Sequence, residues 1–147
     1  MTRIDFYVLN QNTLAARTDY ACRIVEKAVK NQCKVNILTD HANDSSELDE
    51  KLWSFAPESF VPHINLDALE ENQLRSSHSS VNISRDAIEC DDYDLLVNLS
   101  GKVPTKFSRY NRLIEIVVQD SKVLETTRKQ HHYYKERGYP IFVHKIS

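Results

Sequence analysis

Residues Arg3–Leu9 read RIDFYVL, a stretch that alternates and then becomes wholly apolar, which is typical of a central β-strand. A polar segment follows at residues 10–13, and Thr18 or Asp19 is expected to cap a helix after it. That helix is predicted by an apolar stripe at helical spacing, made of Tyr20, Ala21, Ile24, Val25, Ala28 and Val29. A strand that leads into a helix is the first unit of an alternating β–α chain.

The rest of the chain repeats this alternation. Further strands are expected at residues 33–39, 81–84, 93–99, 113–118 and 141–143. A short helix capped by Ser45 or Ser46 is expected to end near Trp53, and a polar helix to span 121–137, where Gly138 ends it. The pattern predicts a single α/β domain over residues 1–147. Its three layers are a mostly parallel sheet with helices on both faces, in a Rossmann-like arrangement.

Composition and cysteine usage are those of a cytoplasmic globular protein. The chain has 147 residues, 41% of them hydrophobic and 27% charged, and no apolar run approaches the roughly 20 residues that span a membrane. The N-terminus lacks a secretory pattern, so no membrane association is expected. Cys22, Cys33 and Cys90 are scattered without a CxxC pair, which favours reduced thiols and disfavours a zinc site; we predict no metal ligands.

Charge is distributed unevenly along the chain although the formal net charge is only −2. Residues 40–94 carry fourteen acidic side chains and three basic ones, whereas residues 102–147 carry ten basic and four acidic ones. The basic end therefore favours an acidic partner. Nucleic acid is the weaker expectation, because domains dedicated to it are usually strongly basic overall.

The sequence lacks the motifs of the common nucleotide-binding and catalytic sites. A phosphate-binding turn needs glycines, but Gly101 and Gly138 are the only two in the chain, and neither follows the first strand. Ser100-Gly101 lacks the preceding GxS of a nucleophile elbow, and Cys90 lies in an acidic stretch that keeps a thiol inert. We predict no catalytic and no cofactor-binding residues, and hence no enzyme but an interaction module.

Residues 52–63, LWSFAPESFVPH, place much aromatic surface on a segment that cannot be regular. They hold the only tryptophan, Trp53, while Pro57 and Pro62 forbid helix or central strand. A hydrophobic loop packed over the core is one interpretation. A surface shaped to receive another protein is the other.

Several blocks resemble, in order, the chi subunits of bacterial DNA polymerase III, small accessory proteins of the clamp loader. They are IDFYVL, YACRIVEKA, LDEKLWSFAPESFVPH, DLLVNL followed by VP, FSRYNRLIEIV and YYKERGYPIFVHK. Together they cover nearly the whole chain except residues 66–92. The resemblance implies a non-catalytic α/β protein of the bacterial replisome with two protein partners. One is the psi subunit of the clamp loader, with which it forms a heterodimer, and the other is the acidic C-terminal tail of single-stranded DNA-binding protein.

The resemblance gives the aromatic segment a partner. It implies that Trp53, Phe60, Val61, Pro62 and His63 face psi, since prolines fix an aromatic patch at low entropic cost. Phe55 can point either way, and a place in the core stays open for Trp53 as well.

The resemblance also implies a site for the tail of the single-stranded DNA-binding protein. Arg128 matches the family's carboxylate-binding arginine, and Val117 matches an apolar member of its socket. His131 stands one helical turn after Arg128, where the family often has tyrosine, and Leu124 one turn before it, where some members have lysine. Lys122, Lys129 and Lys135 supply further positive charge.

The expected function is therefore a replisome adaptor that links the clamp loader, through psi, to coated template and touches DNA only indirectly. The alternative is a protein that binds single-stranded nucleic acid directly through its basic C-terminal end. A nucleotide-binding enzyme is a third possibility, which thermal stabilisation by nucleotides would reveal.

Overall fold

The computed structural model describes residues 1–40, 64–65, 81–84, 94–104 and 106–146. Seven strands lie within these ranges, in the order β3-β4-β2-β5-β6-β1-β7, and all their pairings are parallel. The strands are β1 (Arg3–Leu9), β2 (Val35–Leu38), β3 (Ile64–Asn65), β4 (Val81–Ser84), β5 (Leu95–Asn98), β6 (Arg112–Val117) and β7 (Ile141–Ile146). The predicted parallel α/β sheet is thus confirmed.

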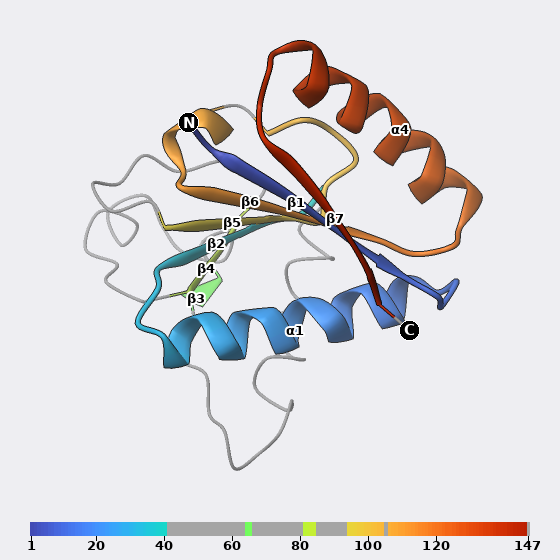
Figure 1. Cartoon of the computed structure of the whole chain (residues 1–147). Helices are drawn as coiled ribbons and strands as arrows, with labels where there is room; N and C mark the ends of the chain where they lie inside the picture. The colour runs from blue at the N-terminus through green and yellow to red at the C-terminus, as the bar shows by residue number, and fades with distance from the viewer. Residues whose placement is uncertain (41–63, 66–80, 85–93, 105, 147) are drawn as a thin grey trace.

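Two helices cover opposite faces of this sheet (Figure 1). Helix α1 (Leu14–Lys30) buries Ala21, Cys22, Val25 and Ala28 against one face, in a core shared with residues of β2, β4, β5 and β6. Helix α4 (Ser121–Glu136) packs Tyr134 against the other face, where β1 and β6 supply most of the apolar side chains. The three-layer arrangement predicted from the strand–helix alternation is confirmed.

The start of α1 differs from the prediction. The N-cap is Thr13, whose hydroxyl accepts a hydrogen bond from Ala16 N at 3.2 Å, so the helix begins before Thr18 and Asp19. Those two residues lie inside the helix, and the Thr18 hydroxyl donates to Leu14 O at 3.1 Å. The first two residues of the helix are solvent-exposed, so the first turn lacks the apolar stripe by which the sequence revealed the rest of the helix.

Element ends were also predicted imperfectly. Strand β7 runs three residues past the predicted range 141–143, because its backbone continues to pair with β1 through Ile146. A short 3₁₀ helix, η2 (Phe107–Arg109), and the two-residue strand β3 were not predicted. The short helix expected after Ser45 or Ser46 lies outside the described residues.

A buried ion cluster joins the three strands β6, β1 and β7. Asp5 is fully buried, and its carboxylate accepts hydrogen bonds from Arg112 Nε at 2.7 Å and Arg3 Nε at 3.1 Å, while His144 Nε2 lies 2.8 Å away. Burial alone raises the pKa of Asp5, but the hydrogen bonds from Arg112, His144 and Arg3 outweigh it and hold the pKa below its usual value. The cluster therefore stabilises the ionised carboxylate.

Asp5→Asn is expected to lower the free energy of unfolding by about 2–3 kcal/mol at pH 7, because it leaves two partly exposed guanidinium groups without their anion. The pKa of Asp5 is depressed by folding, so its contribution is complete above pH ~4 and disappears as pH falls through the lower folded value. Urea unfolding of both proteins across this range measures the difference. Glu125→Gln, which removes an exposed carboxylate, is the control and should change little.

Candidate functional site

Helix α4 positions most of the predicted site residues that the structure describes. Asp120 caps its N-terminus by accepting hydrogen bonds from Lys122 N at 3.0 Å and Val123 N at 3.2 Å. One stripe of the helix faces the sheet, where Tyr134 is fully buried and Val123 is half-buried. The helix is therefore held at both ends, and the side chains flanking the buried stripe have fixed positions.

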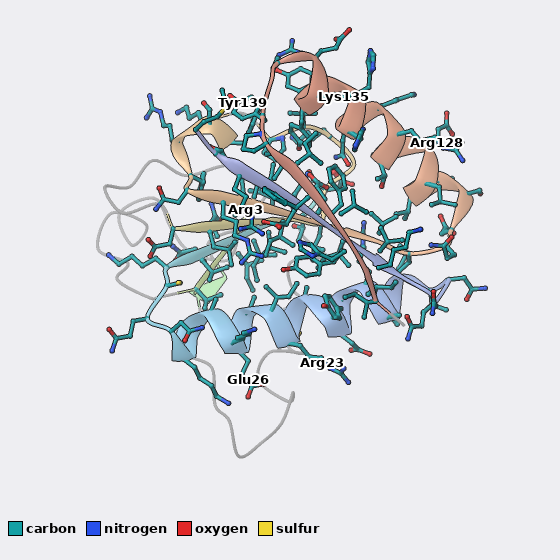
Figure 2. The ribbon with its side chains drawn as sticks, viewed as in Figure 1. Arg3, Arg23, Glu26, Arg128, Lys135 and Tyr139 are labelled. Carbon is teal, nitrogen blue, oxygen red and sulfur yellow. The ribbon has the colours of Figure 1, made fainter. Side chains whose placement is uncertain are left out.

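Leu124, Arg128 and His131 lie on successive turns of α4, at spacings of four and three residues that place them along one side of the helix. Leu124 is half-buried against the apolar core beneath α4. The His131 ring is half-buried too, with its centroid 5.4 Å from that of Phe6. Arg128 is exposed and projects from the helix (Figure 2).

Val117 lies at the end of β6 in the same core as Leu124 and Phe6, with only 2% of its surface exposed. Val8 of β1 is a half-buried member of this cluster. The structure thus brings the four predicted residues to one region, but Val117 supports its floor and offers almost no surface of its own. The accessible apolar surface there comes from half-buried side chains.

Charged side chains of both signs lie near Arg128 on the exposed side of α4. Lys129 and Glu125 form a loose exposed pair at 3.8 Å, and His132 lies 3.1 Å from Glu136. Arg128 is outside both pairs, and in the described part of the chain no carboxylate is paired with it. An exposed guanidinium beside a half-buried apolar strip is suited to binding a carboxylate that carries an apolar group next to it.

The residues predicted to face psi lie outside the described residues. Trp53, Phe60, Val61, Pro62 and His63 belong to the range 41–63, as does Phe55. Their roles stay predictions. Of the cysteines, Cys22 is buried and Cys33 half-buried, and Cys90 lies in the range 85–93, which is not described.

A buried acid that the sequence analysis did not single out lies between β5, β6 and α4. Glu115 is 4% exposed, and its Oε1 accepts hydrogen bonds from Asn98 Nδ2 at 2.7 Å and Tyr134 OH at 2.9 Å. Burial raises the pKa of Glu115 to about 8, although both hydrogen bonds and the charge of Arg17 act in the opposite direction. At neutral pH the side chain is therefore mostly protonated.

Glu115 also lines a cavity of about 320 Å³ at the carboxyl ends of the strands, between the N-terminal turns of α1 and α4. The sequence did contain a sign of this buried acid, because a glutamate inside the strand LIEIV is unusual unless it has hydrogen-bond partners.

Among the residues with described positions, no group of histidine, cysteine, aspartate or glutamate side chains could hold a metal ion. Neither described helix is long and apolar enough to cross a membrane.

Comparisons with known proteins agree on one family. The family model described as "DNA polymerase III chi subunit, HolC" matches residues 1–142. A DNA polymerase III subunit chi of Pseudomonas aeruginosa is 33% identical over 146 residues, covering 99% of this chain and 98% of that protein. The Haemophilus influenzae protein of the same name is 24% identical over 142 residues, covering 97% and 96%.

A solved structure shows the same fold in a different context. Domain 2 of the DEAD-box helicase Mss116p, bound to an RNA duplex, aligns with a TM-score of 0.66 at 12% sequence identity. The alignment covers 97% of this chain and 64% of that one. At this identity the likeness concerns the fold alone.

Glu115→Gln is expected to raise the free energy of unfolding by about 2–4 kcal/mol at pH 8, and less at pH 5. Between pH ~4.5 and ~8 the folded wild type binds one more proton than the unfolded chain, so its stability falls as pH rises. Glutamine keeps an oxygen to accept from Asn98 and Tyr134 but cannot ionise. Chemical unfolding at both pH values tests this, with Glu136→Gln as an exposed control. A variant less stable than wild type at pH 8 would contradict the raised pKa of Glu115.

Proposed function

The chain belongs to the DNA polymerase III chi subunit family, and from this membership we propose that it is a non-catalytic adaptor of the bacterial replisome. One surface binds psi, the clamp-loader subunit, and another binds the C-terminal tail of single-stranded DNA-binding protein. In this adaptor role the chain contacts DNA only indirectly, through the binding protein, and it works in the cytoplasm. When psi and the tail of single-stranded DNA-binding protein are bound in one assembly, two modest affinities combine into avidity for single-stranded DNA that the binding protein covers.

The observation that supports the tail site is the position of Arg128 on α4. Its guanidinium is exposed beside Leu124 and His131, which are half-buried along the same side of the helix. A peptide that ends in phenylalanine presents an aromatic ring and a terminal carboxylate within a few ångströms of each other. The half-buried strip fits the ring, and Arg128 fits the carboxylate.

The surrounding charge suits the rest of such a tail. Residues 121–137 carry five lysines and arginines and two glutamates, and aspartates that precede the terminal ring would meet this positive helix. Such complementarity raises the association rate and makes binding sensitive to salt. The composition of residues 52–63 supports the psi surface, because a stable heterodimer needs apolar aromatic anchors.

Direct binding of single-stranded nucleic acid through the basic end is the competing function. It predicts tight binding of naked oligonucleotide that weakens when Arg128 and Lys129 are replaced, with a steep dependence on salt. The adaptor function predicts instead that Arg128 contributes to binding of the tail peptide and not to binding of naked oligonucleotide.

Arg128→Ala should weaken binding of an acidic peptide ending in phenylalanine by roughly 10- to 150-fold, because it removes a charge-assisted hydrogen bond of about 1.5–3 kcal/mol. Arg128→Lys should restore part of the affinity, since it keeps the charge but loses the bidentate fork. Titration of the labelled peptide at two salt concentrations measures this. Lys30→Ala, which removes an exposed charge from α1 on the other face of the sheet, controls for loss of charge. Equal affinities of wild type and Arg128→Ala would place the tail elsewhere.

Trp53→Ala and Phe60→Ala should each abolish co-purification of psi while they leave binding of the tail peptide unchanged. Truncation of a buried interface aromatic typically costs about 2–4 kcal/mol, enough to lose most of a heterodimer at working concentrations. Co-expression with psi and size-exclusion chromatography provide the measurement. Normal co-purification by the folded double variant would contradict the assignment, and loss of folding would assign the aromatics to the core.

A further inference from the structure

A second cavity lies between α1 and the amino ends of β5 and β6. One of its lining residues, Arg23 on α1, lies on the opposite side of the sheet from Arg128 on α4 (Figure 2). Its volume is about 470 Å³, which is within the range of small-molecule sites. Its polar and aromatic lining comes from α1, from β1, from β6 and from the residue just before β5. The polar and aromatic side chains that face the cavity include Tyr7, Tyr20, Arg23, Lys27, Asp94 and Arg112.

Three cations line this cavity. Arg112 is held in place, since its Nε donates to Asp5 and its Nη2 donates to Tyr7 OH at 2.6 Å, yet 38% of the side chain stays exposed. Arg23 and Lys27 are exposed on adjacent turns of α1. Within the described ranges neither of these two forms an ion pair with a carboxylate, so they are available to an anionic ligand.

Aromatic rings form another part of the wall. Tyr7 and Tyr20 have centroids 5.7 Å apart, and Tyr7 stacks on His144 at 4.8 Å with an interplanar angle of 21°. Both tyrosines are half-buried. Arg23 follows Tyr20 by three residues on α1, so the two side chains lie on the same side of the helix, and both line the cavity. A planar ligand group can therefore stack within reach of a positive charge.

The carboxylate of Asp94, the acidic side chain of the lining, indicates which class of anionic ligand fits the cavity. Asp94 lines the same cavity, and its Oδ2 accepts a hydrogen bond from Lys34 N at 2.7 Å. A carboxylate repels an acidic peptide, but it accepts a hydrogen bond from the amino group of a nucleobase. Inorganic phosphate would need neither the aromatic wall nor the volume.

We propose that this cavity binds a nucleoside phosphate, with the base against Tyr20 and Tyr7 and the phosphate on Arg23, Lys27 and Arg112. The ligand is a free nucleotide or one unit of a single strand, because both present the same base and phosphate. The site lies at the amino ends of β5 and β6 and uses cationic side chains. It therefore does not need the glycine-rich turn whose absence argues against a nucleotide site at the carboxyl ends. The proposal does not rest on the adaptor function.

The test measures binding of dCMP and dTMP by calorimetry, and of a fluorescent single strand of about eight nucleotides by anisotropy. We expect the double variant R23A/K27A to bind dCMP and the strand about ten-fold more weakly or worse than wild type. Both side chains are exposed on a helix, so the variant should fold, and its melting temperature checks this. Lys30→Ala removes one charge from the same helix outside the cavity and should bind like wild type.

A further variant tests the base. Asp94→Asn should reduce the preference for dCMP over dTMP, because the carboxylate accepts from the amino group that only cytosine carries. If the strand binds much more tightly than dCMP, and the double variant lowers the salt slope of strand binding by about 1.4, the ligand is a unit of a single strand. Equal affinities indicate a free nucleotide.

Three results would overturn the proposal. One is no binding of either nucleotide or of the strand by the folded wild type at millimolar ligand. Another is undiminished binding by R23A/K27A. The third is capture of an acidic peptide through Arg23 and Lys27 with no competition from dCMP. Arg128→Ala is measured alongside, so that failure here stays separate from failure of the tail site.

Discussion

The structure depends on how a fully buried carboxylate at Asp5, on the strand next to one edge of the parallel sheet, is kept ionised. An isolated buried charge is costly, so hydrogen-bond donors from the neighbouring strands must meet it. Arg112 enters from β6 and His144 from the edge strand β7, and both lie within 2.8 Å of the carboxylate. This ties an edge strand with two exposed apolar residues, Phe142 and Val143, to its two nearest strands, β1 and β6. The same contacts hold Arg112 and Tyr7 in fixed positions at the wall of the larger cavity.

A second buried acid, Glu115, is kept mostly protonated, whereas Asp5 is kept ionised. Glu115 meets two neutral hydrogen-bond donors in place of two arginines, and burial then raises its pKa to about 8. Because one of the donors is Tyr134, the pair fixes α4 on its face of the sheet. The position of Arg128 on α4 therefore depends on a carboxyl group that is mostly neutral. One acid holds the strands together as an anion, and the other holds a helix as a hydrogen-bond acceptor.

The order of strands and helices could be predicted because buried segments carry strong periodicity. Strand β5, buried along its length, and the apolar stripe of α1 were found from residue types alone. The first turn of α1, residues 14–17, has no apolar stripe, and the last three residues of β7 read His-Lys-Ile, a largely polar stretch, so both boundaries were missed. The functional side chains divide in the same way. Arg128 was proposed as a site residue from family resemblance, whereas Glu115 depends on Tyr134, nineteen residues further along, a pairing that no local pattern contains.

The sheet also separates two positive surfaces that a net charge of −2 conceals. Arg128 lies on α4 above one face, and Arg23, which lines the larger cavity with Lys27, lies on α1 over the other (Figure 2). A charge is screened over a Debye length of about 8 Å at physiological ionic strength, which is less than the diameter of one helix, about 10 Å. The sheet and its side chains lie between the two sites, so the electrostatic interaction between an anion at one site and an anion at the other is weak. Occupation of one surface therefore does not repel a ligand from the other, and a chain with little net charge can present two independent anion-binding faces.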